Sequence, residues 1–156
     1  MPSNDSDTVR KNRYEVAIKL ARVLADSYTL YLKSHNFHWN VTGPQFPQLH
    51  NLFEAQYQEL AKAIDVIAER IRALGEPAPG SYSAFGKLTV LREAEGVPAA
   101  LSMVQILADD HETVAETARQ VLAIAQAAKD EATADLLIAR IDAHDKAAWM
   151  LRATAA

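Results

Sequence analysis

Residues 75–98 read GEPAPGSYSAFGKLTVLREAEGVP, and they form the longest stretch of this chain that glycine and proline interrupt. A second group of glycine and proline residues lies at 43–47, and only Pro2 falls outside these two windows. Both residue types break helices. The rest of the chain is rich in Ala, Leu, Glu, Lys, Arg and Gln, with apolar residues recurring every three or four positions. This pattern predicts helices and contains no strand-like alternation.

The breaks divide the chain into four expected helices, near residues 8–38, 46–74, 99–127 and 131–152. A turn is needed before the last helix, because one uninterrupted helix to residue 156 would be roughly 85 Å long. Lys129 suits a helix C-terminus and Asp130 can cap the next helix. Residues 75–98 can span the height of a bundle, so the second and third helices are expected to run parallel. The prediction is an all-α four-helix bundle with one long crossover, and an up-down-up-down bundle is the alternative.

The composition predicts a single folded domain over residues 1–156, with residues 1–8 as a flexible N-terminal tail. Apolar residues make up 49% and charged residues 23%, and the mean hydropathy is -0.12, which argues against a disordered chain and against a membrane protein. The chain has no cysteine, which excludes thiolate zinc sites, iron–sulfur clusters and disulfide scaffolds. The N-terminus lacks an apolar signal segment, so a cytoplasmic protein is expected, with nucleoid association left open.

Four side chains that can bind a metal share one stripe of the second expected helix. At roughly 100° per residue they come round to nearly the same direction; they are His50, Glu54, Asp65 and Glu69. Apolar neighbours suggest that part of this stripe is buried, where unpaired carboxylates are costly and a cation would stabilise them. However, His50 and Asp65 are roughly 22 Å apart along the helix, so one ion cannot touch both.

A second copy of the chain resolves this distance. If the same helix of a partner lies antiparallel, with the two-fold axis near Glu59 and Leu60, the two ends of the stripe meet and two equivalent sites form. His38 ends the preceding helix and can fold back toward the site. The expected ligands are three residues of one chain and two of its partner, in order His38, His50, Glu54, Asp65 and Glu69.

These nitrogen and oxygen donors suit iron, and they can also take zinc or manganese. Taken singly, each residue has a plainer interpretation: a histidine at a helix end is often a cap, and the carboxylates resemble a solvated face paired with Lys62 or Arg70. Five ligands in compatible positions favour the metal site. No Glu-x-x-His sequence occurs in the chain, which argues against a di-iron centre built inside one bundle.

The run His38-Trp39-Asn40, followed at these intervals by the other four ligands, resembles the Dps proteins, also called mini-ferritins. Segments 130–137 and 145–149 are also similar to the last helix of that family. The resemblance implies a ferritin-like four-helix bundle with a short extra helix in the crossover. It also implies a hollow dodecamer of twelve identical subunits, with a ferroxidase centre across each two-fold interface and ferric iron stored inside.

By resemblance, His38, His50, Asp65 and Glu69 stand at the family's iron-ligand positions, while Glu54 stands where many members have Asp. The implied activity is the oxidation of Fe(II) to Fe(III) with hydrogen peroxide, or with dioxygen, which protects against oxidative stress. Trp39 is a candidate acceptor for a stray oxidising equivalent, and its alternative role is that of an aromatic side chain buried at an interface.

The remaining histidines are expected to be less informative. His35 lies one turn before His38 and either supports the site or simply packs, whereas His111 and His144 are expected on solvated helix faces. A cage also needs an acidic pore for iron entry. The candidates cluster at the start of the last helix, where capping is an equally good explanation for them: Asp130, Glu131 and Asp135.

DNA binding has only weak support in the sequence. The N-terminal basic group consists of Arg10, Lys11 and Arg13, and a shell of twelve chains with net charge -4 would carry about -48. Weak or salt-sensitive DNA binding, or none, is therefore expected. Two other functions are left open: a nucleoid-compacting DNA-binding protein with a secondary metal site, and a helical assembly with a structural zinc site.

Overall fold

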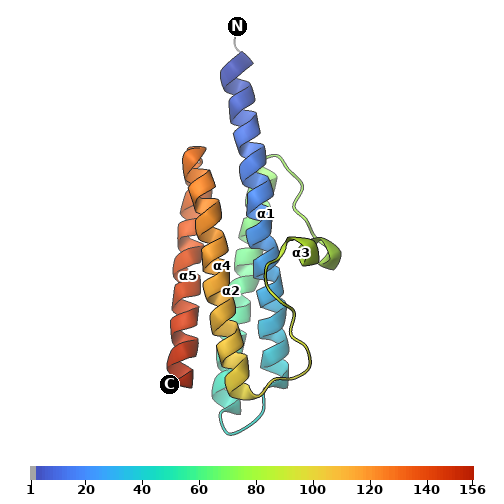
Figure 1. Cartoon of the computed structure of the whole chain (residues 1–156), viewed down its shortest axis with the longest axis vertical. Coiled ribbons are helices and arrows are strands. Elements are labelled where there is room, and N and C mark those ends of the chain that lie inside the picture. Colours follow the sequence, from blue (N-terminus) through green and yellow to red (C-terminus); the bar gives the residue numbers. More distant parts are fainter. Residues whose placement is uncertain (1–2) are drawn as a thin grey trace.

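The computed structural model describes residues 3–156 and shows helices joined by loops (Figure 1). No strand occurs in this part of the chain, so the all-α prediction is confirmed. The helices are α1 (Ser3–Asn40), α2 (Phe46–Ala73), α3 (Tyr82–Leu88), α4 (Ala100–Ala127) and α5 (Glu131–Ala155). The short helix α3 lies within the crossover, as the resemblance implied.

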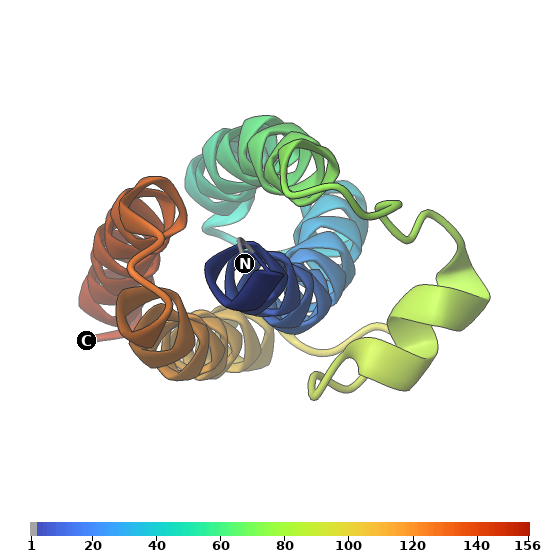
Figure 2. The same cartoon turned by 90° about the horizontal axis from the view of Figure 1, so that it is seen from above.

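The chain order produces a one-crossover bundle. α1 and α2 form one antiparallel pair and α4 and α5 form another, while residues 74–99 return along the bundle before α4 begins (Figure 1). As a result α2 and α4 run parallel, as predicted, and the up-down-up-down alternative is wrong. Viewed along the bundle, the four long helices surround a common core and α3 lies outside it (Figure 2).

Local backbone chemistry explains where the helices end. Gly43 and Gly75 have φ values of 112° and 103°, which L side chains rarely adopt, and they follow α1 and α2 respectively. The predicted turn after α4 is also present. Lys129 has φ 57°, and the Asp130 side chain accepts a hydrogen bond of 3.1 Å from the backbone N–H of Thr133, so Asp130 caps α5.

The core between the helices consists of two clusters of buried apolar residues. One cluster, toward the α1 N-terminal half, includes Leu20, Leu24, Ile67, Val121 and Leu137. The other, toward the α1 C-terminal half, includes Phe37, Phe53, Leu107, Val114 and Leu151. Burying each large side chain contributes about 1.5–3 kcal/mol to the stability of the fold. These contacts therefore hold the long helices in register and position the side chains that point away from the core.

The N-terminus differs from the prediction. α1 begins at Ser3 rather than near residue 8, so residues 3–8 of the expected tail are helical, and Met1 and Pro2 lie outside the described residues. This end of α1 projects beyond the other long helices (Figure 1). Farther along, the Arg13 side chain donates a 2.7 Å hydrogen bond to the Ala73 carbonyl at the end of α2. None of the described helices is long and apolar enough to cross a membrane.

Two buried charged residues of α1 hold the crossover against the bundle. Lys33 forms a 2.6 Å ion pair with Asp110 of α4 and donates to the Arg92 carbonyl at 2.8 Å. About two helical turns earlier, Asp26 accepts hydrogen bonds from the Thr89 hydroxyl and the Val90 N–H. Buried charges are tolerated when they are paired, as Lys33 is, or hydrogen-bonded, as Asp26 is. These contacts fix the segment that follows α3 against α1.

Candidate metal centre

His38 and His50 form the centre of the candidate site. His38 is the third-last residue of α1 and His50 lies in the second turn of α2, and the short loop between the helices brings their rings together. The ring centroids are 3.8 Å apart and the planes are inclined by 14°. His38 is buried and His50 is half-buried. Two histidines that are twelve residues apart therefore act as one stacked pair.

Reciprocal hydrogen bonds select the tautomer of both rings. His38 Nδ1 donates to the His50 carbonyl at 2.7 Å, and His50 Nδ1 donates to the His38 carbonyl at 2.7 Å. A carbonyl oxygen only accepts, so each Nδ1 carries a proton, and the neutral tautomer that these bonds select has its lone pair on Nε2. Metal-binding histidines commonly use this arrangement, in which the second ring nitrogen donates to a backbone carbonyl. Both rings are thus prepared to bind a metal through Nε2.

The three carboxylates lie on the outer side of α2. Glu54 is half-buried and one turn after His50, whereas Asp65 and Glu69 are exposed near the other end of the helix. None of the three side chains has a hydrogen bond or ion pair with another residue of segment 3–156. The alternative was that a neighbouring cation neutralises the carboxylates of this stripe. Arg70 does not do so, because it pairs with Asp130 at 2.9 Å.

One chain does not complete a metal site by itself. Among residues 3–156, no group of three or more His, Asp or Glu side chains could share one ion. The structure brings His38 and His50 together but leaves Asp65 and Glu69 at the far end of α2. Such a division of the ligands is what a site between two antiparallel chains requires.

Aromatic rings surround the histidine pair. Phe46, the first residue of α2, stacks on His50 at 4.9 Å, and Tyr57 contacts His38 edge-on at 5.2 Å. His35 lies between Tyr57 and Trp39, with centroid distances of 4.3 Å and 4.0 Å. Burial, and then the charge of nearby His38, lower the pKa of His35. Trp39 is 59% exposed in the single chain, so it is not buried without a partner.

Sequence reasoning missed Tyr57 and Phe46 as neighbours of this site. A signal for Tyr57 was present, because it lies three residues after Glu54 and so shares its side of the helix. Phe46 had no comparable signal, since its contact with His50 depends on the path of the loop that enters α2.

The prediction for His111 and His144 is wrong. Both are buried, with 2% and 0% exposure, and their Nδ1 atoms are 2.9 Å apart in the core between α4 and α5. Arg140 donates to His144 Nε2 at 3.2 Å and to Glu59 at 2.7 Å. Flanking acidic residues suggested a solvated face. Most of these acids are exposed while the histidines face the core, and Asp110 is paired with Lys33. Burial lowers the pKa of His111 to about 3 and that of His144 well below its usual value of 6.5.

The three acidic pore candidates have different environments. Asp130 accepts hydrogen bonds from Thr133 and pairs with Arg70, so the capping interpretation holds for this residue. Burial alone would raise the pKa of Asp130, but these hydrogen bonds and the Arg70 charge together lower it. Glu131 and Asp135 are exposed. The structure thus leaves two of the three candidates facing solvent.

Comparisons with known proteins agree with this fold. A model of the ferritin-like domain matches residues 18–156. An uncharacterized low temperature-induced protein of Nostoc sp. is 41% identical over 154 residues, which cover 97% of this chain and 86% of the relative. DNA protection during starvation protein 2 of Bacillus anthracis is 40% identical over 134 residues, covering 86% and 92%.

A solved structure is also similar. The Dps protein of Vibrio cholerae O1, described as a member of a broad superfamily of ferritin-like diiron-carboxylate proteins, has a TM-score of 0.89 and 30% identity over 92% of this chain and 91% of that one. The one-crossover bundle and the matched domain define a ferritin-like protein. Within that class, the chain belongs to the Dps family.

Proposed function

We propose that this chain is a mini-ferritin that oxidises Fe(II) to Fe(III) at sites shared by two chains and stores the ferric product in a hollow shell. One observation carries the proposal: the reciprocal hydrogen bonds of His38 and His50 leave both Nε2 lone pairs free for a metal. Glu54 follows one turn later with a free carboxylate. Membership of the Dps family, whose Vibrio cholerae member is described among diiron-carboxylate proteins, supports the same function.

The donor set fits iron. Two imidazole nitrogens and three carboxylates form a hard-to-borderline site, and carboxylates stabilise Fe(III) more than Fe(II), which favours oxidation. Zinc and manganese accept similar ligands and are expected to compete. The absence of cysteine keeps thiolate-preferring metals at a disadvantage.

Asp65 and Glu69 enter the site from the partner. They are exposed and unpaired within the described part of the chain, and like-charged carboxylates one turn apart repel each other until a cation lies between them. An antiparallel partner would bring its Asp65 and Glu69 against His50 and Glu54. Two equivalent sites then form for each pair of chains, and six pairs make the twelve-subunit shell that the family resemblance implies.

The residues of the site would bind and orient two Fe(II) ions so that one oxidant meets both. Two Fe(II) ions, one hydrogen peroxide and two protons then give two Fe(III) ions and two water molecules, and no unpaired oxidant is released. Exposed acids at the start of α5, Glu131 and Asp135, would attract Fe(II) toward the interior. Asp130 is left out of this role because Arg70 neutralises it.

DNA binding is a weaker candidate. Of the N-terminal basic group, Arg13 is bound to the Ala73 carbonyl and Arg10 lies 3.8 Å from Asp7. The net charge of -4 per chain opposes phosphate. We therefore propose weak, salt-sensitive binding as a secondary property at most.

The proposal is tested by loading the metal-free protein with Fe(II) under anaerobic conditions and then adding hydrogen peroxide. Ferric absorbance reports oxidation, and light scattering reports the mass of the particle. Rapid stoichiometric oxidation is expected in particles of about twelve chains. The D65N variant should assemble normally and lose the oxidation, because Asn cannot supply the anionic oxygen. Oxidation no faster than in protein-free buffer would refute the proposal.

A further inference from the structure

Four of the five tyrosines of the chain form a continuous row that starts at the candidate metal centre. We call this set the tyrosine row, and in order it contains Tyr57, Tyr31, Tyr28 and Tyr82. Tyr57 belongs to α2, Tyr31 and Tyr28 belong to α1, and Tyr82 begins α3. The remaining tyrosine, Tyr14, has no ring contact with another described residue and is 53% exposed.

Each member of the row contacts the next through its ring. The centroid distances are 6.1 Å from Tyr57 to Tyr31, 5.7 Å from Tyr31 to Tyr28 and 6.4 Å from Tyr28 to Tyr82. All three pairs meet edge-to-face, an ordinary and favourable geometry for aromatic rings. The row therefore has no gap in which a saturated side chain separates two phenols.

The inner end of the row touches the metal ligands. Tyr57 meets the ring of His38 at 5.2 Å and stacks on His35 at 4.3 Å. His35 in turn contacts Trp39 at 4.0 Å. Both the metal centre and the adjacent indole are thus one ring away from the first tyrosine.

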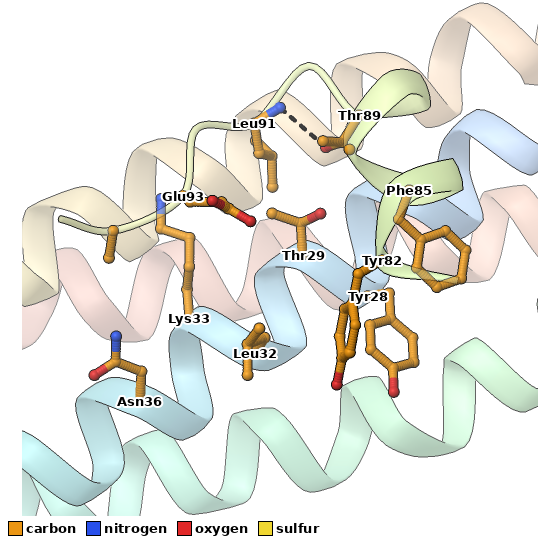
Figure 3. A pocket seen from close by; sticks show the side chains of 12 residues that line it. Tyr28, Thr29, Leu32, Lys33, Asn36, Tyr82, Phe85, Thr89, Leu91 and Glu93 are labelled. Carbon is orange, nitrogen blue, oxygen red and sulfur yellow. Dashed lines mark hydrogen bonds between the residues drawn. The ribbon is translucent and has the colours of Figure 1, made fainter. Parts of the chain in front are cut away.

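The outer end reaches the crossover. There Tyr28 stacks on Phe85 at 4.9 Å, and Tyr82 lies beside them at the wall of a cavity of about 440 Å³ between α1 and α3 (Figure 3). Tyr82 is 74% exposed in the single chain. The row therefore leads from a partly buried site to a surface where solutes can reach a phenol.

Packing alone does not explain the choice of residue. Phenylalanine would fill the same positions, and none of the four hydroxyl groups is hydrogen-bonded to another residue of segment 3–156. What a phenol offers and a phenyl ring does not is oxidation by one electron with loss of its proton. Rings in contact also exchange electrons much faster than rings separated by other side chains.

We infer that the tyrosine row carries single oxidising equivalents away from the metal centre to Tyr82, where a small soluble reductant such as ascorbate can quench them. The inference rests on the proposed ferroxidase function, because the oxidising equivalents arise there. Its use is in turnovers that begin with only one Fe(II) bound, when the oxidant cannot take both of its electrons from iron.

One Fe(II), one hydrogen peroxide and one proton give Fe(III), one water and one hydroxyl radical. The hydroxyl radical takes a hydrogen atom from the Tyr57 phenol, which leaves water and a tyrosyl radical. Each following step moves one electron back along the row, from Tyr31, then Tyr28, then Tyr82. The phenol that is oxidised releases its proton to water, and the phenoxyl radical that is reduced takes a proton from water, because all four side chains are at least partly exposed. Ascorbate finally gives a hydrogen atom to Tyr82, so every phenol of the row is restored.

The test uses the assembled protein with less than one Fe(II) per site, mixed with hydrogen peroxide and frozen for electron paramagnetic resonance. Tyrosine-to-phenylalanine variants keep the rings and remove only the phenols. The wild type should show a tyrosyl radical, and a spin trap should be found on Tyr82 by peptide mass spectrometry. Y31F should lose the adduct on Tyr82 and keep a radical on Tyr57, whereas the matched control Y14F should resemble the wild type. Iron oxidation should be unchanged in all variants.

Some results would overturn the inference while leaving the proposed function intact. Iron oxidation without any tyrosyl radical in the wild type would do so. An adduct on Tyr82 that survives in Y31F would do so too, because the row would then not be the path. Loss of the signal in Y14F would show that the radicals form at random on exposed tyrosines.

A second measurement needs no iron and decides the matter if iron oxidation itself fails. The chain has two tryptophans, so W149F leaves Trp39 alone, and azidyl radicals from pulse radiolysis oxidise it in the metal-free protein. The absorption of the Trp39 radical should convert to tyrosyl absorption at a rate independent of protein concentration. The added substitutions Y57F and Y31F together should abolish this phase, and its persistence would refute the inference.

Discussion

His38 and His50 each donate Nδ1–H to the backbone carbonyl of the other, at 2.7 Å in both directions. The two helices that carry them are thereby joined at their ends, and the same bonds select the tautomer in which Nε2 is free. A single interaction thus serves both the fold and the site. These two contributions can be separated by substitution, because asparagine and glutamine place an amide nitrogen near different ring atoms.

The first prediction concerns His50. In H50N the amide nitrogen lies near the position of Nδ1, so it can still donate to the His38 carbonyl, but no group replaces Nε2. We expect affinity for Fe(II), or for Co(II) as a stable probe, to fall by at least about 10-fold. Unfolding free energy should change by no more than about 1 kcal/mol. Calorimetric titration and chemical denaturation measure the two quantities.

The matched variant is H50Q, whose amide lies near Nε2 and cannot reach the carbonyl. It should lose more stability than H50N because a buried carbonyl loses its donor. If both variants bound metal as tightly as the wild type, His50 would not be a ligand.

The second prediction concerns the division of the site between chains. E54Q damages the half that contains the histidines, and D65N damages the half expected from the partner, so each variant alone should be inactive. When the two are unfolded and reassembled together, half of the pairs are mixed and one of their two sites is intact. About a quarter of the wild-type iron oxidation should return. No recovery in correctly assembled mixed particles would show that both halves come from one chain.

Much of the fold could be predicted because local chemistry and tertiary structure agree. Lys129 and Asp130 were expected to end one helix and start the next, and they do so with the backbone and cap that their chemistry favours. The start of α1 was placed too late. Polar residues before Thr8 suggested a tail, but they continue a helix that already exists, and extending a helix costs less than starting one.

The histidines show where such prediction fails. His38 and His50 were paired correctly because both lie close to one short loop, so chain connectivity limits their positions. His111 and His144 lie on different helices, and their acidic neighbours indicated solvent. Whether a histidine faces the core depends on the rotation of each helix, which the packing of all four helices decides. Only three-dimensional structure reveals that they share a hydrogen bond.

The third prediction follows from this buried pair. The pKa of His111 is about 3 in the folded protein and near 6.5 when unfolded, so the unfolded chain binds the proton more tightly. The contribution of His111 to the free energy of unfolding is therefore fully present above about pH 6.5. Up to about 5 kcal/mol of it is lost as the pH falls toward 3. Urea denaturation at a series of pH values measures the loss.

In H111N the Asn oxygen can still accept from His144 Nδ1, but the position no longer titrates. The variant should be less stable at neutral pH because of the lost volume, yet its stability should fall less steeply between pH 6.5 and 4. A slope equal to that of the wild type would show that other groups control the acid sensitivity.

The fourth prediction separates capping from iron entry at the start of α5. D130N should destabilise the fold by about 1–3 kcal/mol, because it weakens the cap and leaves Arg70 without its carboxylate. The lowered pKa of Asp130 adds stability that is present above its unfolded value near 3.8 and is lost below it. Thermal unfolding at pH 7 and in acid measures both effects.

Glu131 and Asp135 provide the contrast. E131Q combined with D135N should leave stability nearly unchanged, since both side chains are exposed, and should slow the uptake of Fe(II) into the particle. Uptake at the wild-type rate would remove these two residues from the entry route, whatever the result for Asp130.

The fifth prediction concerns DNA. Arg10 and Lys11 are exposed near the N-terminal end of α1, whereas Arg13 is engaged with the Ala73 carbonyl. Any binding through this segment should be electrostatic and should weaken steeply between about 50 and 200 mM salt. The logarithm of the binding constant should fall linearly with the logarithm of the salt concentration. Gel-shift titrations across that range give the slope.

R10Q combined with K11Q should reduce the slope by about 2 if each residue contacts one phosphate, while R13Q should mainly destabilise the end of α2. The net charge of -4 per chain repels phosphate, so losing two cations from every subunit should also weaken binding at every salt concentration. Tight binding that survives both substitutions and resists salt would instead place a DNA-binding surface on the body of the bundle.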